Sequence, residues 1–568
     1  MLPLLSKRYL FIYLVFMIGF GIVGYRLIFL GIYRDRFSDF IQVARQRVRT
    51  LEAERGNIID RQGRCLATQQ KVYDVGVDLT QIRECDRTYL PQLASLLSIP
   101  LNTLDTFWEK SKRRWKPLLN DVSESLYKKI MALKIFGVYG NPKQQRSYLH
   151  TTSLSHIVGF INKENTPVCG IEKMMHFYLK GQQGYLAYEV NGKNEEVRQY
   201  RKERIAPVKG CTVQLTIDNQ IQKFTEQALM NAQEKYKPES LHALVTNPNS
   251  GEILALVNVP FFDANHYKDF PIDVLTNKAV SNIYEPGSVF KTITVSAALD
   301  CNAIQLNDSF NCGLRSANYH GKELPLPKDW KSFNQVMSVA DILHNSSNKG
   351  IVQIGFKLGA ERLYHYGKMF GFGDSTLSGF EGETKGIFRP IKQWDGLTIT
   401  RLPIGHSVAC SLFQMHYAMG TVINGGTLMY PQIIRHVYDD KGNLLLTFPP
   451  KVHRQVLKPQ TSQIMRSLLL LSENSKAFIP HYNVSGKTGT TQKIVDNHYS
   501  HTQHIASFSG FFPNRNPQIQ ITITVDSPHV IGTGYGSIVA APIFKEIAEN
   551  IIAYMGILPE PKLLTDHA

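Results

Sequence analysis

Residues 284–300 read YEPGSVFKTITVSAALD, a turn followed by an apolar stretch with a helical pattern. Pro286 and Gly287 are typical of a turn that leads into a helix. Ser288 is therefore expected at a helix N-terminus, where free N–H groups and the helix dipole favour negative charge. Lys291 follows three residues later on the same helix face. Because a lysine removed from water can take a hydroxyl proton, the stretch predicts a nucleophilic serine.

The Ser-x-x-Lys pattern is weak alone, because the chain contains it three times. Ser125 lies in the polar stretch SESLYKKIMALK, which indicates a surface helix. The third copy begins at Ser346, which also forms Ser-x-Asn with Asn348. A hydroxyl can relay a proton, and an amide can both donate to and accept from a peptide. We therefore expect Ser346 and Asn348 to serve the same site as Ser288, although Ser-x-Asn alone is equally consistent with a helix-turn motif.

A third element, VSGKTGTT at residues 484–491, is predicted to be a strand. An extended strand beside a serine can offer its backbone to a peptide ligand, and Lys487, Thr488 and Thr490 could hold a carboxylate. A phosphate-binding loop is the competing interpretation of Gly-Lys-Thr, but the first glycine of that motif is missing here. The three elements follow one another at spacings of 58 and 141 residues, which is much more specific than any one of them.

Together the elements resemble the S-x-x-K, S-x-N and K-T-G set of penicillin-binding proteins and class A β-lactamases. Four further stretches extend the likeness over nearly the whole chain: RGNIIDR (55–61), GIEK (170–173), LKGQQG (179–184) and PNSGEILA (248–255). The sequence resembles a class B penicillin-binding protein, the monofunctional peptidoglycan D,D-transpeptidase. The resemblance implies an α+β penicillin-binding/transpeptidase fold, with an antiparallel sheet flanked by helices, after a membrane helix and an elongated N-terminal pedestal module.

The resemblance also implies the role of each site residue. Ser288, deprotonated by Lys291, attacks the carbonyl of the penultimate D-Ala of a stem peptide, and Ser346 passes the proton to the leaving D-Ala. The N–H groups of Ser288 and Thr490 form the oxyanion hole. β-Lactams acylate Ser288 as substrate mimics, and no cofactor or metal is expected. Substrate binding falls to Asn348, Lys487, Thr488, Gly489 and Thr490.

The Ser-Ser-Asn middle motif resembles the division-specific branch, the penicillin-binding protein 3 type, since the elongation branch typically carries Asp in the third place. The stretches 405–407 and 411–414 depart from the family's G-x-G…T-P-x-Q pattern. The alternatives to a septal transpeptidase are an elongation-type transpeptidase, a D,D-carboxypeptidase or β-lactamase-like hydrolase, and a penicillin-sensing or scaffold protein.

An uncharged run of 17 residues, Tyr9–Tyr25, indicates a membrane helix, and Arg26 can snorkel so that the apolar run continues to Tyr33. A cleaved signal peptide is the alternative, but the run is long and no A-x-A site follows. We expect a single-pass anchor in a bacterial inner (cytoplasmic) membrane, with the catalytic part outside. The expected segments are 1–8 (cytoplasmic tail), 9–33 (anchor), 34–210 (N-terminal dimerisation/pedestal-like module), 211–556 (transpeptidase) and 557–568 (C-terminal tail).

The chain of 568 residues is too long for one domain, and its composition, 43% apolar and 19% charged, excludes a disordered protein. Its net charge of +16 lies almost wholly in residues 1–210, which carry 33 Lys and Arg against 19 Asp and Glu. No zinc-finger, RNP-like or helix-turn-helix pattern supports nucleic-acid binding. A basic part next to a membrane anchor suggests docking instead. The family supplies the expected partners: peptidoglycan stem peptides, β-lactams, a polytopic septal glycosyltransferase and other divisome membrane proteins.

Seven cysteines are an odd number, so at least one is unpaired in an exported chain. Cys301 and Cys312 are close enough in sequence to pair, but we expect free, buried thiols instead.

Overall fold

The computed structural model describes residues 3–33, 45–81, 83–102, 104, 115–149, 152–192, 195–201, 203–333, 335–495, 498–530 and 535–561. The chain forms two compact units. One unit comprises residues 1–54 and 180–210, and the other comprises residues 55–179 and 211–568. The expected segment boundaries at residues 210 and 556 stay predictions.

The N-terminal helix α1 spans Pro3–Ile32, 30 residues without a Pro or charge in its central part. Residues Lys7–Ile32 have a mean hydropathy of 2.0 and none of this stretch is buried in the protein. At about 1.5 Å per residue, 26 residues span about 39 Å, which exceeds the roughly 30 Å of a bilayer core. The expected apolar helix is confirmed, and it is long enough to cross a membrane.

The first unit also contains a four-stranded sheet made of β1 (Gln46–Leu51), β6 (Gly184–Val190), β7 (Glu196–Val197) and β8 (Glu203–Ile205). In β1, Arg47 lies opposite Tyr188 and Arg49 lies opposite Leu186. Since side chains alternate along a strand, the two arginines share one face of the sheet.

The second unit opens with a seven-stranded sheet in the order β20-β19-β9-β2-β3-β4, with β5 also paired to β3. Two helices, α3 (Leu90–Leu97) and α5 (Glu124–Ala132), form a small core with its long strands, and Ser125 lies in α5 on the surface as expected. The strands are β2 (Ile58–Ile59), β3 (Cys65–Asp78), β4 (Trp115–Ser123), β5 (Val138–Tyr148), β9 (Thr212–Leu215), β19 (Ile434–Tyr438) and β20 (Leu444–Thr447).

Two of the sequence stretches that carry the family resemblance meet in a buried ion cluster. Glu172, from the GIEK stretch, is fully buried and accepts hydrogen bonds from Arg55 Nε at 2.5 Å and from Arg146 Nε at 2.7 Å. Arg55 also donates to the Glu172 carbonyl at 2.8 Å, and Arg146 donates to the Gly56 carbonyl at 2.7 Å. The cluster therefore ties the start of this unit to β5 and to α7 (Gly170–Met174).

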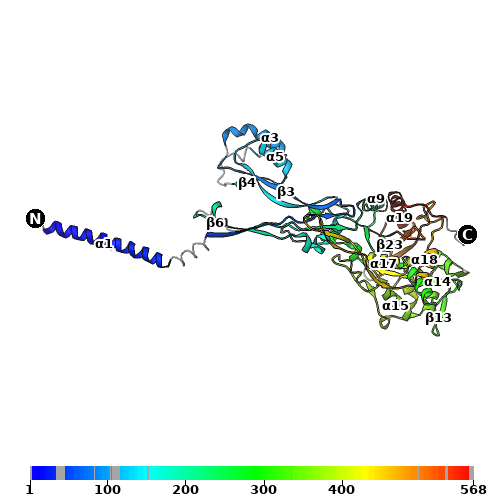
Figure 1. Cartoon of the computed structure of the whole chain (residues 1–568). Coiled ribbons are helices and arrows are strands. Elements are labelled where there is room, and N and C mark those ends of the chain that lie inside the picture. Colours follow the sequence, from blue (N-terminus) through cyan, green and yellow to red (C-terminus); the bar gives the residue numbers. More distant parts are fainter. Residues whose placement is uncertain are drawn as a thin grey trace. The chain divides into compact units, whose positions relative to one another are not determined.

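A five-stranded antiparallel sheet in the order β11-β10-β24-β23-β22 forms the centre of the unit. In β10, Leu241, Ala243 and Val245 pack with α9 and α19, whereas Leu244 faces the opposite core. Helices α9 and α19 lie side by side (Figure 1), joined by a hydrogen bond from Asn231 to Glu546 of 2.7 Å. The elements are α9 (Asn219–Tyr236), β10 (Ser240–Thr246), β11 (Ile253–Val259), β22 (Ser485–Val495), β23 (His498–Phe512), β24 (Ile519–Asp526) and α19 (Ala540–Met555).

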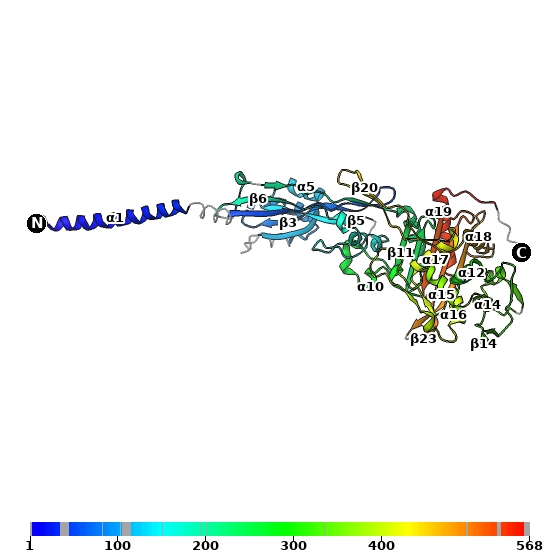
Figure 2. The same ribbon diagram turned by 60° about the horizontal axis from the view of Figure 1, so that its bottom comes forward.

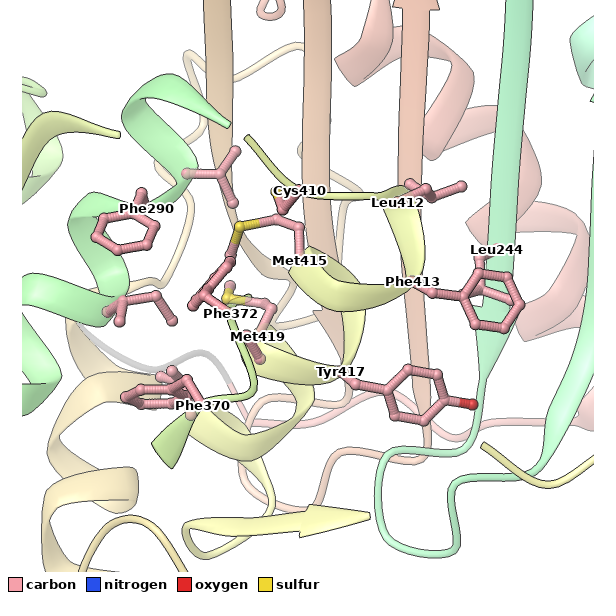
Figure 3. Packing of buried hydrophobic residues seen from close by; sticks show 14 of the residues in the cluster. Leu244, Phe290, Phe370, Phe372, Cys410, Leu412, Phe413, Met415, Tyr417 and Met419 are labelled. Carbon is pink, nitrogen blue, oxygen red and sulfur yellow. The ribbon is translucent and has the colours of Figure 1, made fainter. Parts of the chain in front are cut away.

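The other face of the sheet is covered by α17 (Leu412–Ile423), every residue of which is buried. Figure 3 shows Phe413 of α17 pointing towards Leu244 of β10, while Met415 and Met419 point towards Phe372. The stretch 411–414, which departs from the family pattern, is a capping box: Ser411 accepts from the Gln414 N–H and Gln414 accepts from the Ser411 N–H. The departure therefore keeps the helix start intact.

Helices α12 (Lys291–Asp300), α14 (Asn348–Leu358) and α15 (Ala360–Met369) pack together on this side of the unit (Figure 2). The expected fold, an antiparallel sheet flanked by helices, is confirmed. No disulfide joins the seven cysteines, all of which lie among the described residues. The expectation of buried thiols is right for Cys312 and Cys410 and wrong for the others, since Cys85 is exposed and the remaining four are half-buried.

Candidate active site

Ser288 lies in a 3-10 turn, Gly287–Val289, that runs directly into α12. The turn is held by a hydrogen bond from the Gly287 N–H to the Gly405 carbonyl at 3.1 Å. A Cβ on Gly405 would lie 2.1 Å from the Gly287 carbonyl oxygen, and Gly405 has a φ of +82°, so only glycine fits there. The close approach of these two segments fixes the place of Ser288 at the start of the helix.

Lys291, at the first position of α12, is completely buried. Its Nζ lies 2.7 Å from the Ser346 carbonyl oxygen, 3.1 Å from Ser346 Oγ and 2.6 Å from Asn348 Oδ1. An ammonium has three N–H donors, and the three acceptors match them. The first and second sequence motifs are thus joined by direct hydrogen bonds.

Ser346 lies between α13 (Val339–His344) and α14, with a φ of +56°. This left-handed conformation is uncommon for a serine and is found mostly at constrained functional positions. Lys487 Nζ donates to Ser346 Oγ at 3.0 Å, so the hydroxyl lies within hydrogen-bond reach of both lysines. The third motif is therefore connected to the other two through Ser346.

Burial changes the acid–base properties of both lysines. The pKa of Lys291 is held well below its usual value, first by burial and then by the charge of Lys487, while Asp329 partly opposes the shift. Burial lowers the pKa of Lys487 to about 8. Desolvation disfavours the charged form of an amine, so the free base of Lys291 is more accessible here than it would be in water.

The Lys-Thr-Gly-Thr stretch lies in β22, the edge strand of the five-stranded sheet. A Cβ on Gly489 would lie 2.8 Å from the Pro286 carbonyl oxygen, so glycine lets the strand pass close to the turn that bears the serine. Thr490 Oγ1 accepts a hydrogen bond from the Gly536 N–H at 2.9 Å. An edge strand beside a serine can take a peptide as an additional strand.

The predicted residues meet at one cleft of about 450 Å³. Lys291 alone among the eight does not line it, since it lies buried behind Ser346. A cleft of this size is typical of small-molecule and peptide sites. The seven that line the cleft are Ser288, Ser346, Asn348, Lys487, Thr488, Gly489 and Thr490.

Sequence reasoning missed Asp329, which positions the middle motif. Its carboxylate accepts a hydrogen bond from Ser347 Oγ at 3.0 Å and from the backbone N–H groups of Asn348 and Lys349 at the start of α14. The S-D-N version of the motif has an aspartate where this chain has Ser347. Asp329 supplies a carboxylate next to that position from a separate loop, and the only signal for it in the sequence was the serine in the second place.

A second missed group lies at the rim of the cleft. Glu285, three residues before Ser288, accepts hydrogen bonds from His406 Nδ1 at 2.9 Å, from the Ser407 N–H at 2.9 Å and from Tyr499 OH at 3.1 Å. His406 and Ser407 belong to the stretch that departs from the family's G-x-G, and Ser407 has a φ of +62° where the family has glycine. The hydrogen bond between Glu285 and His406 therefore lies beside Ser407, the position at which this stretch departs from G-x-G.

Comparison with known proteins agrees with this geometry. The model of the penicillin-binding protein transpeptidase domain matches residues 241–549, and that of the penicillin-binding protein dimerisation domain matches residues 50–215. Stage V sporulation protein D of Bacillus subtilis is 31% identical over 97% of this chain and 86% of its own length. Peptidoglycan D,D-transpeptidase FtsI of Escherichia coli is 26% identical over 90% of this chain and 86% of its own length.

Solved structures share the fold. Penicillin-binding protein 2X of Streptococcus thermophilus has a TM-score of 0.74 at 20% identity, covering 89% of this chain and 80% of its own. Penicillin-binding protein 3 of Mycobacterium tuberculosis, complexed with aztreonam, has a TM-score of 0.69 at 24% identity, covering 90% of this chain and 98% of its own. With both domain models matched in order and a relative above 30% identity along nearly its full length, the chain belongs to the class B penicillin-binding proteins, which carry a transpeptidase domain.

Proposed function

We propose that this protein is a peptidoglycan D,D-transpeptidase that cross-links stem peptides through an acyl-enzyme on Ser288. The observation that carries the proposal is the hydrogen-bonded group formed by Lys291, Ser346, Asn348 and Lys487 beside the serine. These are the members expected of a serine acyltransferase that uses a lysine base, and they come from three separate parts of the chain. The family assignment and the names of the relatives support the same reaction.

In the first half-reaction, the free base of Lys291 accepts the proton of Ser288 as Oγ bonds to the carbonyl carbon of the penultimate D-Ala. The negative charge that develops on the carbonyl oxygen is stabilised by backbone N–H groups of Ser288 and Thr490. The C–N bond to the terminal D-Ala then breaks, and the leaving amine takes up a proton relayed from Lys291 through Ser346. The contact between Lys291 Nζ and Ser346 Oγ, 3.1 Å, supports this relay.

Substrate binding in this proposal uses the rest of the cleft. Lys487, Thr488 and Thr490 hold the terminal carboxylate, and the backbone around Gly489 pairs with the peptide as a strand. Asn348 contacts the stem-peptide backbone. β-Lactams enter the same cleft and acylate Ser288, since their amide replaces the D-Ala–D-Ala amide.

A burst experiment tests this reaction. The donor is a peptide whose C-terminal D-alanine carbonyl forms a thioester. It is mixed with the full-length protein in detergent, and release of the thiol leaving group is followed over time. One equivalent of thiol per protein should appear rapidly, followed by slower turnover that accelerates when D-alanine is added as acceptor. A protein that releases no burst, or whose turnover ignores the acceptor, would contradict a transpeptidase and favour a hydrolase or a sensor.

We propose further that α1 anchors the protein once in a bacterial inner membrane, with the N-terminus in the cytoplasm and the catalytic unit outside. The length and hydropathy of α1 support the anchor, and large downstream domains are translocated largely regardless of flanking charge.

The Ser-Ser-Asn motif supports a role at the division septum, where the protein docks to a polytopic glycosyltransferase and other divisome membrane proteins. Tethering raises the effective concentration of the cleft near nascent strands.

Docking is predicted to require Arg47 and Arg49 of β1 and Arg45 directly before it. The test protein carries two changes: residues 9–33 are exchanged for an unrelated membrane helix, and Arg45, Arg47 and Arg49 are replaced by glutamate. This protein should no longer co-purify with the septal glycosyltransferase and should not support septation, but it should still be labelled by a β-lactam. The three arginines are exposed, so their reversal costs little stability. The matched control reverses three exposed lysines of the catalytic unit: Lys322, Lys392 and Lys441. Normal division and normal co-purification in the doubly altered protein would contradict docking through this part.

A further inference from the structure

The Glu285–His406 pair at the rim has the geometry of a positioned general base. The carboxylate of Glu285 is nearly buried, with 9% of the side chain exposed, whereas 29% of the His406 side chain is exposed. His406 Nδ1 lies 2.9 Å from Glu285 Oε2. Because a carboxylate can only accept, Nδ1 carries a proton and Nε2 of the neutral ring has a free lone pair.

Glu285 is held in place from several directions. Besides His406, its carboxylate accepts from the Ser407 N–H and from Tyr499 OH, and its carbonyl accepts from Thr491 Oγ1 at 2.9 Å. Burial and the neighbouring carboxylate raise the pKa of Tyr499 to about 12, so its hydroxyl remains a donor at neutral pH. The histidine ring is therefore oriented by a fully engaged carboxylate, as a base requires.

The pair lies close to the nucleophile but away from the two lysines. The Gly287 N–H donates to the Gly405 carbonyl. Ser288 follows Gly287 in the chain and His406 follows Gly405, so this hydrogen bond brings the two residues near each other. Along β22, Lys487 contacts Ser346 at one point, and Thr491, four residues further, contacts Glu285. Four residues of a strand span about 13 Å. The cleft thus has a lysine end and a histidine end, and both His406 and Ser288 line it.

We propose that His406 is the base that deprotonates the acceptor amine in the second half of the reaction. The inference rests on the proposed function, since it assigns a residue to the step that follows acylation. The amine nitrogen bonds to the carbonyl carbon of the Ser288 ester, and its surplus proton passes to His406 Nε2. Lys291 gave the Ser288 proton to the leaving D-Ala in the first half-reaction, and it takes a new proton from solvent before the second. The C–O bond to Ser288 then breaks, and Oγ accepts this proton from the Lys291–Ser346 group. The new amide is released, and His406 returns its proton to solvent.

The second half-reaction needs both a proton donor for Ser288 Oγ and a proton acceptor for the amine. Once solvent has reprotonated Lys291, the Lys291–Ser346 group donates a proton to Ser288 Oγ as it leaves and cannot at the same time accept the amine proton, so His406 serves as the separate acceptor. His344 also lines the cleft, but it is exposed and no hydrogen bond orients its ring among the described residues. His406 is the cleft histidine with an orienting carboxylate.

The burst assay separates the two half-reactions. In His406→Gln, one equivalent of thiol should still be released rapidly, whereas transfer to D-alanine should fall by about 10²-fold or more. In His406→Ala, added imidazole should restore transfer without changing the burst. His266→Gln is the matched control: its Nδ1 lies 2.9 Å from Asp263 Oδ2, the same pairing, but it does not line the cleft, and both phases should match the wild type.

The outcomes are distinct. Loss of the burst in the wild-type protein would contradict the proposed function itself. A normal burst with transfer within twofold of wild type in His406→Gln would overturn the role of His406 alone. Three other results would also overturn the role of His406: a lost burst in His406→Gln, no recovery of transfer when imidazole is added to His406→Ala, and an equal loss of transfer in His344→Gln.

Discussion

Acylation of Lys291→Arg by a β-lactam is expected to be about 10²–10⁴-fold slower than acylation of the wild type. A guanidinium stays protonated at any accessible pH, so it keeps the positive charge but cannot accept the proton of Ser288. Lys291 is completely buried, and burial lowers its pKa well below the usual value, so its free base is available only because of this site. Stopped-flow measurement of labelling gives the rate directly.

Two control variants distinguish the loss of the Lys291 base from an effect of side-chain size. Lys291→Met preserves most of the volume without a charge and should lose acylation as well. Lys368→Arg, a change at a surface ion pair with Asp374 of 2.7 Å, should acylate at the wild-type rate. If Lys291→Arg acylates as fast as the wild type while Lys291→Met does not, Lys291 acts as a fixed charge and the proposed base is wrong.

The wild-type pH profile of acylation by a donor with a free carboxylate follows from the same two amines. The rate should rise with pH as Lys291 loses its proton, since only the free base accepts the Ser288 proton. It should fall as pH passes about 8, where Lys487 loses the charge that attracts the carboxylate. A donor without a carboxylate should keep the rising limb and lose the falling one, and Lys291→Arg should lack the rising limb.

Glu172→Gln is expected to destabilise the catalytic unit by about 3–5 kcal/mol, because it leaves Arg55 and Arg146 buried without a countercharge. The substitution keeps the side-chain volume, so the loss reports on charge rather than on a cavity. Exposed fractions of 8%, 2% and 0% for the side chains of Arg55, Arg146 and Glu172 leave little solvent to compensate. Denaturant unfolding of the full chain in detergent measures the effect as a shift of the transition midpoint.

The matched control for Glu172→Gln is Glu124→Gln in α5. Glu124 pairs with Lys128 at 2.8 Å on the helix surface, with both side chains largely exposed, and such pairs contribute little. It should leave the midpoint unchanged. Equal midpoints for Glu172→Gln and the wild type would show that the cluster does not stabilise the catalytic unit.

Much of the cleft was predictable because each motif is short and contiguous. Three motifs could be recognised in the sequence: Ser288 with Lys291, Ser346 with Asn348, and the stretch around Gly489. The structure brings the three motifs together at one cleft. The α1 helix was predictable because an apolar run is a local signal, whereas the sheet flanked by helices was implied by the family resemblance.

The residues that sequence reasoning missed act over distance or depart from a motif. Asp329 lies 18 residues before the serine it binds, in a loop without a pattern of its own. His406 and Glu285 are 121 residues apart, and no periodicity connects them. The contact between Arg55 and Glu172 spans 117 residues, so the buried ion cluster was not visible in the sequence.

The most direct test of the central claim is the position of the penicillin adduct. The full-length protein is labelled with penicillin, its intact mass is measured, and the modified peptide is sequenced by mass spectrometry, with Ser288→Ala treated in parallel. We predict a single adduct on Ser288 in the wild type and none in Ser288→Ala, whose lost hydroxyl is too small to disturb the fold. An adduct on Ser346, or full labelling of Ser288→Ala, would contradict the account.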